Sequence, residues 1–421
     1  MLSGTSDAEN RAAVGIENLT MFSDRKVYLD HSATTPVDSR VLEAMLPYLT
    51  EKFGNASSVH YFGQEARGAV DRARRSVAGL IGARPNEIVF TSGGTEANNL
   101  AVRGLCEAAR DHGRHIITSQ IEHPSVRGVC DELEKRGWEV TRLPVYSRGV
   151  IKLEDVRAAL RPETILITVM LANNEIGTIQ PVADIAELVR EERAAGHRYL
   201  WLHTDAVQAA GRLPISVEEL GCDLLSMSAH KMYAPKGTGA LFIKRGLRMI
   251  SQMVGGHQER ERRAGTESVP NIVAFGVASE LGRAELAQRA AHTQALRDKF
   301  EAGVRSRIED IVFNGDNNAR LPHLSNISFR FIEGEGLLIN LDLQGVAVST
   351  GSACSSGTLE PSPVIRALGH NEELARGSIR FSFGKDNTDE DVEYVLDVLQ
   401  RAVTNLRRLS PLARKAILEA V

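Results

Sequence analysis

A lysine and an aspartate each follow an apolar run in the middle of the chain. Lys231 ends the run SMSAHK, which continues the apolar segment CDLL, and Asp205 ends the strand-like run WLHTD 26 residues earlier. That separation suits one strand–crossover–strand unit, which puts both side chains at the carboxyl ends of neighbouring strands. A surface lysine and a solitary strand-end aspartate would give the same pattern. A cofactor that needs both a lysine amine and a carboxylate is pyridoxal phosphate, through its aldehyde and its pyridine nitrogen.

A glycine turn and a histidine follow two other strand-like runs. The segment TSGGTE at 91–96 joins a glycine turn to a helix start, where backbone N–H groups and the positive end of the helix dipole can face a phosphate. Such turns are common before helices, and no P-loop lysine follows this one. His123 comes just after the run HIIT and directly before a proline that favours a helix start. It is therefore either a helix cap or a group near a ligand.

Amide side chains stand beside two strand ends. Asn173 and Asn174 follow the run TILITV, where paired asparagines either shape a turn or donate to an oxygen of a ligand. Gln208 lies three residues after Asp205, close enough for both to reach one planar ring at a helix entry. In an open α/β sheet, ligands occupy the crevice beyond the carboxyl ends of the strands. Polar groups after four strands, together with Lys231, therefore predict a ligand site there.

Cys354 lies in the segment STGSACSSGT, which is small, polar and rich in glycine. A buried structural cysteine has apolar neighbours, so we expect this thiol to be exposed on a mobile loop. An exposed cysteine with an activated thiolate is a nucleophile, and the alternative is an incidental surface thiol. The other three cysteines lie in helical patterns or beside a strand and are expected to be structural: Cys106, Cys130 and Cys222.

An arginine lies inside the strand-like run SIRFSF. From there the Arg380 guanidinium could hold a substrate carboxylate through two hydrogen bonds, or form a salt bridge at the surface. The glycine–asparagine loop FGNASS at 53–58 could assist it.

Composition limits the classes of function. The chain has 421 residues, 43% of them hydrophobic and 25% charged, with a formal net charge of −4, which suits a soluble globular protein long enough for two domains. It carries no basic stripe for nucleic acid and no apolar run of the roughly 18 residues that a membrane span needs. The cysteines form no CxxC pair, so neither a zinc site nor a disulfide framework is indicated. We therefore predict a cytoplasmic protein with no nucleic-acid or membrane partner.

Strand-like and helix-like runs alternate through the first two thirds of the chain, after about 25 residues that lack the apolar core of a secretory signal and are expected to form a short arm. This alternation is typical of a parallel sheet with covered faces. The run 238–243 is expected to be a hairpin partner. After about residue 270 we expect a smaller α+β unit. It would contain a helical stretch over 272–307, a strand with one exposed face over 326–331, a helix over 336–343, a strand over 379–383 and a closing helix over 389–409.

Ten segments, taken in order, resemble the pyridoxal-phosphate-dependent cysteine desulfurases of the nitrogen-fixation and iron–sulfur-cluster-assembly type. The resemblance covers roughly residues 27–410. The segments are YLDHSATTPV (28–37), FGNASS (53–58), TSGGTE (91–96), EHPSV (122–126), NNEIGTIQP (173–181), TDAVQAAG (204–211), SAHKMYAPKG (228–237), RAGTESVP (263–270), STGSACSSGTLEPS (349–362) and IRFSFG (379–384).

The resemblance implies the α/β fold of the type I pyridoxal-phosphate enzymes. A large cofactor-binding domain, residues 36–284, would contain a mostly parallel seven-stranded sheet. A smaller α+β domain, residues 285–421, would carry the cysteine loop, and residues 1–35 would form an arm and a segment that joins the small domain. The family also implies a homodimer whose active sites lie at the subunit interface.

The resemblance also assigns a role to each matching residue. Lys231 would hold the cofactor covalently and move the substrate α-proton, Asp205 would face the pyridinium nitrogen, and His123 would stack on the ring and shuttle protons. Cys354 would be the nucleophile that carries a persulfide. The remaining residues form three groups: Asn174 and Gln208 at the phenolic oxygen, Gly94, Thr95, Ser228, His230 and, reaching over from the other subunit, Thr266 at the phosphate, and Asn55 and Arg380 at the substrate carboxylate.

The implied reaction converts L-cysteine to L-alanine and leaves a persulfide on Cys354, from which an iron–sulfur scaffold protein or another acceptor takes the sulfur. A selenocysteine lyase or an aminotransferase of the same fold is a rival that the thiol disfavours, because transamination needs no nucleophilic cysteine. A non-catalytic scaffold for cluster assembly is a second rival, against which Lys231, His123 and Cys354 argue together. Cys354 could also ligate iron transiently, with further ligands from a partner protein.

Overall fold

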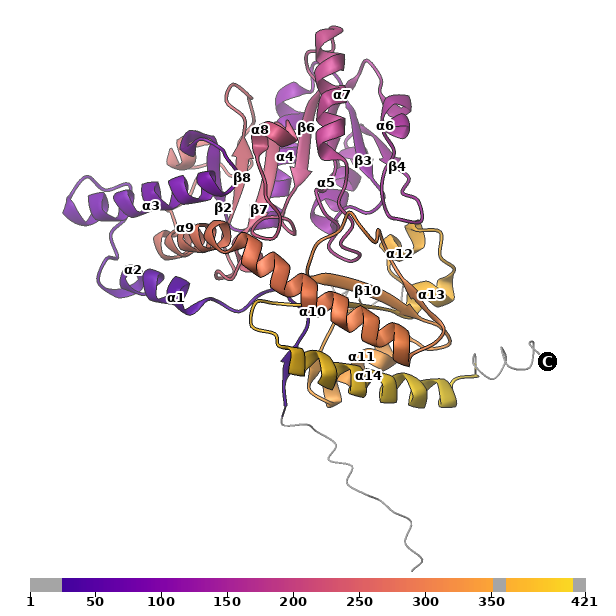
Figure 1. The fold of residues 1–421 in the computed structure, drawn as a ribbon. Coiled ribbons are helices and arrows are strands. Elements are labelled where there is room, and N and C mark those ends of the chain that lie inside the picture. Colours follow the sequence, from indigo (N-terminus) through magenta and orange to yellow (C-terminus); the bar gives the residue numbers. More distant parts are fainter. Residues whose placement is uncertain (1–24, 351–360, 412–421) are drawn as a thin grey trace, which may run out of the picture.

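The computed structural model describes residues 25–350 and 361–411. Its largest element is a seven-stranded sheet with the order β2-β8-β7-β6-β5-β3-β4 (Figure 1). Only β8 (Gly239–Ile243) runs against the others: it pairs antiparallel with β2 and β7, while all other pairs are parallel. The predicted mostly parallel sheet and its hairpin partner are therefore confirmed. The other strands are β2 (Ile88–Thr91), β3 (His115–Ser119), β4 (Glu139–Leu143), β5 (Thr164–Thr168), β6 (Trp201–Asp205) and β7 (Leu224–Ser228).

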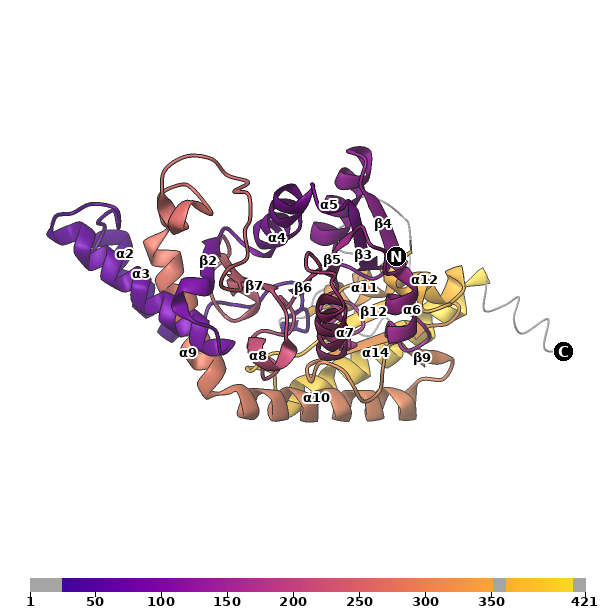
Figure 2. The same ribbon diagram turned by 90° about the horizontal axis from the view of Figure 1, so that it is seen from above.

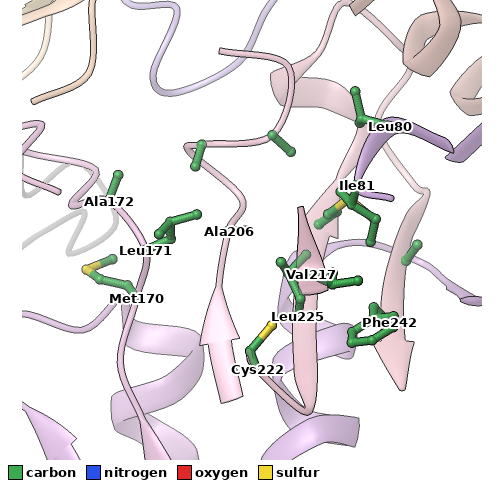
Figure 3. Packing of buried hydrophobic residues seen from close by; sticks show 14 of the residues in the cluster. Leu80, Ile81, Met170, Leu171, Ala172, Ala206, Val217, Cys222, Leu225 and Phe242 are labelled. Carbon is green, nitrogen blue, oxygen red and sulfur yellow. The ribbon is translucent and has the colours of Figure 1, made fainter. Parts of the chain in front are cut away.

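Helices cover both faces of this sheet, with α4 and α5 on one side and α7 and α8 on the other (Figure 2). Successive residues of a strand point to opposite faces, so Val89 of β2 packs with α4 and α5 while Phe90 joins the core on the other side. Phe242 and Leu225 belong to that second core (Figure 3). Because both faces are covered, the central strands are buried along nearly their whole length. These helices are α4 (Gly94–Ala109), α5 (Pro124–Lys135), α7 (Val182–Ala194) and α8 (Val217–Leu220).

The second core continues between two long helices, α3 and α9, which lie side by side in both views (Figures 1 and 2). Their backbones approach so closely that a Cβ on Gly276 would lie 2.6 Å from the Ala73 Cα, so only glycine fits at that position. The remaining helices of this part are shorter. The elements are α1 (Ser39–Met45), α2 (Pro47–Thr50), α3 (Tyr61–Leu80), α6 (Leu153–Ala159) and α9 (Val269–Ala284).

The last third of the chain forms a smaller α+β unit around a separate core. A three-stranded antiparallel sheet, β12-β10-β9, packs under α10 and α14, with Phe300, Phe329 and Phe381 fully buried. β1, from the start of the described chain, pairs with β11 and buries Leu29 in the same core. The elements are β1 (Val27–Tyr28), β9 (Ile311–Phe313), β10 (Leu324–Phe329), β11 (Val346–Ala347), β12 (Ser378–Ser382), α10 (Leu286–Arg307), α11 (Gly334–Leu343), α12 (Pro363–Ala367), α13 (Glu372–Arg376) and α14 (Asp389–Leu409).

Two expectations from the sequence are wrong in detail. The helical stretch over 272–307 is two helices, separated at Glu285 (φ −104°, ψ 8°), whose carboxylate pairs with Arg40 and Arg289. Gly282 lies inside α9, three residues before the break, and is the local signal for a helix end near this point. The strand expected over 326–331 has no exposed face, because every residue of β10 is buried beneath packed helices.

The predicted domain boundaries remain a prediction. The one between residues 284 and 285 coincides with the break between α9 and α10, and the first 24 residues of the predicted arm lie outside the described residues. Within residues 25–350 and 361–411, none of the helices combines the length and the apolar character of a membrane span.

Candidate active site

The carboxyl ends of five strands meet at one edge of the large sheet. Because only β8 is reversed, β2, β3, β5, β6 and β7 all point the same way. The segments that follow them carry Gly94, His123, Asn174, Asp205 and Lys231, respectively. The structure thus brings the predicted strand-end groups to a single edge, as expected for an open α/β sheet.

Asp205 is a buried carboxylate with two neutral donors. Its exposed fraction is 5%, its Oδ2 accepts from the Asn98 Nδ2 at 2.7 Å, and its Oδ1 accepts from the Val207 N–H at 2.9 Å. The described residues give it no salt-bridge partner. A buried anion held only by neutral donors favours a cation beside it, such as a protonated ring nitrogen.

His123 caps the N-terminus of α5, which confirms one of the two interpretations from the sequence, and its place near a ligand stays a prediction. Its Nδ1 accepts from the Ser125 N–H at 3.1 Å and lies 2.7 Å from the Ser125 Oγ. Burial lowers the pKa of the imidazole, the negative charge of Asp205 raises it, and the positive charges of Lys231 and Arg127 lower it. These opposing effects mean that His123, Asp205 and Lys231 lie within electrostatic reach of one another.

Lys231 ends a short 3-10 turn, η2 (Ala229–Lys231), directly after β7. Its Nζ donates to the carbonyl oxygens of Ser32 and Ala33, the latter at 2.6 Å. No role for this HSATT segment was predicted from the sequence. The carbonyl oxygens of Ser32 and Ala33 are neutral, so they orient the Lys231 amine with less attraction than a carboxylate would exert. The amine can therefore leave these two oxygens to react.

Gln208 binds the same backbone segment. Its Nε2 donates to the Ser32 carbonyl at 2.9 Å, and its Oε1 accepts from the Arg212 Nη1 at 2.9 Å. The helix entry expected after Asp205 is wrong: turns follow over 207–212, because the Asp205 carboxylate accepts from its own chain two residues on. The role of Gln208 at a phenolic oxygen stays a prediction.

The turn between β2 and α4 is shaped for close approach. A Cβ on Gly94 would lie 2.8 Å from the Val207 Cγ2, so glycine at 94 lets the start of α4 approach Val207, while Ser228 would be in ordinary contact at 3.5 Å. Thr95 is exposed at the same helix start. His230 lies with its Nδ1 3.1 Å from the Thr34 Oγ1, and burial lowers its pKa to about 4, which leaves the ring uncharged at neutral pH. Hydroxyls, imidazole and backbone N–H groups at a helix start suit a phosphate.

Arg380 is buried, with an exposed fraction of 3%, so the alternative of a surface salt bridge is wrong. Its Nη1 donates to the Asn174 carbonyl at 2.8 Å and its Nη2 to the Asp30 Oδ1 at 2.7 Å. Its Nε is buried and has no hydrogen-bond partner among the described residues. Two of the five N–H groups of the guanidinium make these hydrogen bonds, so it retains donors for a ligand.

Asn55 and Thr266 lie on exposed loops. The Asn55 Oδ1 accepts from the Ser57 N–H at 2.9 Å, and the described residues of this single chain do not link either side chain to the group around Lys231. Ser57 and the segment 256–260, which precedes Thr266, line one cleft of about 420 Å³. The two loops therefore belong to one surface.

Cys354 lies outside the described residues, but the residues on both sides of the gap are anchored. Ser349 exchanges two backbone hydrogen bonds with Arg380, at 2.7 and 3.2 Å. The Ser362 hydroxyl donates to the buried Glu175 Oε2 at 2.5 Å. The chain therefore leaves the described structure beside Arg380 and re-enters it beside Asn174.

The other three cysteines are buried, as expected for structural residues. Burial raises the pKa of the Cys130 and Cys222 thiols to about 12, which suppresses their thiolates. Groups of three metal-ligating side chains do not occur among the described residues. The predicted transient iron ligand, Cys354, is outside that range.

The residues at the sheet edge fit pyridoxal phosphate by their chemistry. Lys231 offers an amine for its aldehyde, the buried and unpaired charge of Asp205 suits its protonated ring nitrogen, and the close turn at Gly94 with Ser228 suits its phosphate. Asn98 and Ser125, which link Asp205 to His123, were missed in the sequence because a polar residue inside a helical pattern carries no sign of its partners.

Known proteins share this architecture. The aminotransferase class-V family model matches residues 27–395. The chain is 50% identical to the cysteine desulfurase IscS of Dictyoglomus turgidum, over 92% of this chain and 97% of the relative, and 48% identical to that of Methanosarcina thermophila, over 93% and 95%. A solved NifS-like protein superposes with a TM-score of 0.85 at 37% identity, over 91% of this chain and all of that one. The structure of SspA in complex with cysteine gives a TM-score of 0.75 at 35% identity, over 86% and 99%. The chain therefore belongs to the class-V aminotransferase family and, within it, to the cysteine desulfurases.

Proposed function

We propose that this protein is a pyridoxal-phosphate-dependent cysteine desulfurase that converts L-cysteine to L-alanine and transfers the sulfur to Cys354. The observation that carries the proposal is the meeting of Lys231, Asp205 and His123 at one sheet edge, within electrostatic reach of one another. The relatives named cysteine desulfurase and the cysteine complex of SspA support the same substrate.

The cofactor would be held by Lys231 at its aldehyde, by Asp205 at its ring nitrogen and by His123 on the ring face. Asn174 and Gln208 would meet its phenolic oxygen, and the helix start at Gly94 and Thr95 would meet its phosphate together with Ser228 and His230. When bound, pyridoxal phosphate supplies an electron sink for the negative charge that forms on the substrate carbon.

The side chains of this chain divide the remaining work. Arg380 and Asn55 hold the substrate carboxylate, and the Lys231 amine takes the α-proton. The Cys354 thiolate attacks the substrate sulfur, so that an S–S bond forms while the carbon–sulfur bond breaks and its electron pair stays on carbon. That carbon takes a proton, for which His123 is the shuttle, and alanine leaves. The product on the protein is a persulfide.

The test begins with an absorption spectrum of the purified protein, followed by L-cysteine, a reductant and assays for alanine and sulfide. We expect a yellow protein that releases both products in equal amounts. Cysteine consumption without sulfide would point instead to an aminotransferase or lyase of the same fold. A Lys231→Ala variant that kept full sulfide production would contradict the role of the lysine.

The proposal also separates Cys354 from the cofactor site. A Cys354→Ala variant should lose persulfide formation and keep the absorbance of the bound cofactor, because no described contact makes the site depend on this thiol. Ser279→Ala, which removes a buried hydroxyl in α9, is the control. Loss of the cofactor spectrum in Cys354→Ala would mean that the cysteine is structural.

We also propose a homodimer. Large apolar side chains are exposed along the loops that carry Asn55 and precede Thr266, whereas monomers rarely expose contiguous apolar patches of this kind. Phe53 and Val254 have exposed fractions of 69% and 92%. The patch comprises Leu42, Leu46, Leu49, Phe53, Val59, Tyr61, Phe62, Met253 and Val254. A second copy on this surface would bring the exposed Thr266 to the other subunit's site.

Mixing two inactive variants tests the shared site. Lys231→Ala removes the cofactor lysine, and Thr266→Glu places a carboxylate where the phosphate of the partner's site is expected. In a randomly re-paired 1:1 mixture, about a quarter of the sites carry neither change, so activity should return towards that fraction. No recovery, with subunit exchange verified by mass, would contradict a shared site.

The persulfide needs an acceptor, and we propose a sulfur-accepting protein such as an iron–sulfur scaffold, reached by the segment that carries Cys354. Three buried, unpaired thiols suit a reducing compartment, which supports a cytoplasmic location. Transfer of labelled sulfur from the loaded enzyme to a purified scaffold protein tests the acceptor. Retention of all the label on the enzyme would contradict it.

A further inference from the structure

Asn98 bridges two groups of the candidate site. It lies in α4 with an exposed fraction of 1%, and its Nδ2 donates to the Asp205 Oδ2 at 2.7 Å and to the Ser125 Oγ at 2.8 Å. The orientation of the amide is fixed, because the opposite one would set its oxygen against the Asp205 carboxylate. Both hydrogens of the amide nitrogen are therefore used.

The hydrogen bonds that Asn98 and Ser125 donate determine which nitrogen of the His123 ring carries the proton. Because the Ser125 Oγ accepts from Asn98, its own hydrogen points to the nearest acceptor, the His123 Nδ1 at 2.7 Å. That Nδ1 also accepts from the Ser125 N–H at 3.1 Å. A nitrogen that faces two donors carries no proton of its own, so the proton of the uncharged ring lies on Nε2.

We propose that Asn98 and Ser125 are positioning residues that hold the uncharged ring of His123 as the tautomer with its proton on Nε2. Asn98 also donates to Asp205, so the hydrogen bonds that fix this tautomer are connected to the Asp205 carboxylate. The proposal deepens the proposed function and rests on it for the role of His123 as a proton shuttle. With Nδ1 occupied by Ser125, only Nε2 can exchange a proton with a bound substrate.

The charges around His123 have opposite effects on the protonation of its ring, so a hydrogen bond that favours the uncharged form is significant. Asp205 on β6 favours the charged ring, while Lys231 on η2, Arg127 on α5 and burial favour the uncharged one. A donor on Nδ1 stabilises the uncharged ring further, because a protonated Nδ1 would face that donor. The relay thus offsets the pull of Asp205 with hydrogen bonds that start at Asn98, which donates both to Asp205 and to Ser125.

The first experiment reads the ring directly. Holoenzyme labelled with ring-¹⁵N histidine is titrated by NMR, and the His123 signals are those lost in His123→Gln. We expect Nδ1 to be unprotonated and Nε2 protonated above the pKa. In Ser125→Ala the His123 pKa should rise by roughly half to one pH unit, the equivalent of one neutral hydrogen bond. The acid limb of kcat/KM should move with it.

Two further variants separate positioning from folding. Ser125→Thr keeps a hydroxyl and should restore the wild-type titration. Ser279→Ala removes a buried hydroxyl that bonds only the Phe275 carbonyl of its own helix, and it should leave His123 unchanged. An unshifted His123 in a folded, cofactor-loaded Ser125→Ala, or a protonated Nδ1 in the wild type, would overturn the relay.

A double-mutant cycle tests whether Asn98 acts through Ser125. Asn98→Leu keeps the side-chain volume and removes both donors, so it should shift His123 in the same direction as Ser125→Ala. In the Ser125→Ala background the Asn98→Leu shift should vanish. Additive shifts would overturn the serial relay.

The experiments can contradict the hydrogen-bond relay and the proposed function independently of each other. The ¹⁵N spectra report the tautomer whatever the protein does with cysteine. A relay confirmed in a protein that releases no sulfide would contradict the desulfurase assignment alone. A desulfurase with an unchanged His123 in both variants would contradict the relay alone.

Discussion

Three consecutive residues other than glycine hold left-handed backbone angles in the loop before Thr266. The φ values of Glu259, Arg260 and Glu261 are 47°, 57° and 65°. Such residues persist only where their surroundings determine them. Glu259 is buried, its two carboxylate oxygens accept from Arg74 at 2.6 and 2.7 Å, and one also accepts from the Phe90 N–H at 3.1 Å. This ion pair therefore fixes the strained loop against β2.

Glu261 offers a direct measure of that strain. Its side chain is exposed and contacts His257 at 2.8 Å, a surface pair of little energetic weight. Glu261→Gly should raise the free energy of unfolding by about 0.5–1 kcal/mol, because glycine adopts this φ without steric strain while losing some chain entropy. Urea denaturation at one fixed protein concentration measures the change. Glu261→Ala keeps a Cβ and should gain nothing; an equal gain would assign the effect to the lost charge.

Glu122, next to His123, should make stability depend on pH. Burial raises the pKa of this carboxyl from its ordinary value of 4.5 to about 8, and one of its oxygens is buried without a partner among the described residues. Between those pH values the unfolded chain releases a proton that the folded one keeps. The contribution of Glu122 is therefore complete below pH 4.5 and is lost as pH rises towards 8.

Replacement by glutamine isolates this effect. Glu122→Gln imitates the protonated carboxyl and keeps an acceptor for Ser119 and the Met170 N–H. Relative to the wild type, it should gain stability steadily from pH 5 to pH 8. Thermal unfolding across that range is the measurement, and a pH-independent difference would show that the wild-type carboxyl is already charged when folded.

At the scale of elements, the hydroxyl of Ser362 both caps a helix and donates to a buried carboxylate. It accepts from the N–H groups of Val364 and Ile365 as the N-cap of α12, and it donates to Glu175. Ser362→Ala should lower the free energy of unfolding by about 1–2 kcal/mol, because it removes a cap and leaves a buried carboxyl without its donor. Ser362→Thr keeps the hydroxyl and serves as the control in urea denaturation. Equal losses in both variants would indicate a packing effect.

The sequence predicts the elements better than their interruptions. The β-branched runs and the alternation of strands with helices are local properties, so β2, β3, β5, β6, β7, β8 and the sheet edge that they form could be foreseen. The edge strand β4, which carries charged residues and is only partly buried, was not predicted. Glu285, at the break between α9 and α10, pairs with the distant Arg40, and the Lys231 amine binds the Ser32 carbonyl oxygen 199 residues away. Neither of these long-range contacts can be recognised from the neighbouring sequence. Asn98 could not be foreseen either, because its partners come from two other segments.

At the scale of the molecule, the proposed dimer depends on the patch between Leu42 and Phe62. Leu49→Glu and Phe53→Glu place charges on side chains that are 56% and 69% exposed in the single chain. Both should weaken dimerisation by more than tenfold, because each charge would have to be desolvated in an apolar interface. Sedimentation velocity over a dilution series measures the change. Leu409→Glu, on an equally exposed leucine at the end of α14, should leave the assembly intact.

The ion pair between Asp30 and Arg380 carries a consequence for how substrate enters. The guanidinium proposed to receive the cysteine carboxylate already neutralises a carboxylate of its own chain, at 2.7 Å. The carboxylate of an incoming amino acid must therefore displace the Asp30 carboxylate, which stays close to Arg380 because it belongs to the same chain. The substrate carboxylate therefore binds by exchange with a carboxylate of the same chain, and not at an unpaired guanidinium.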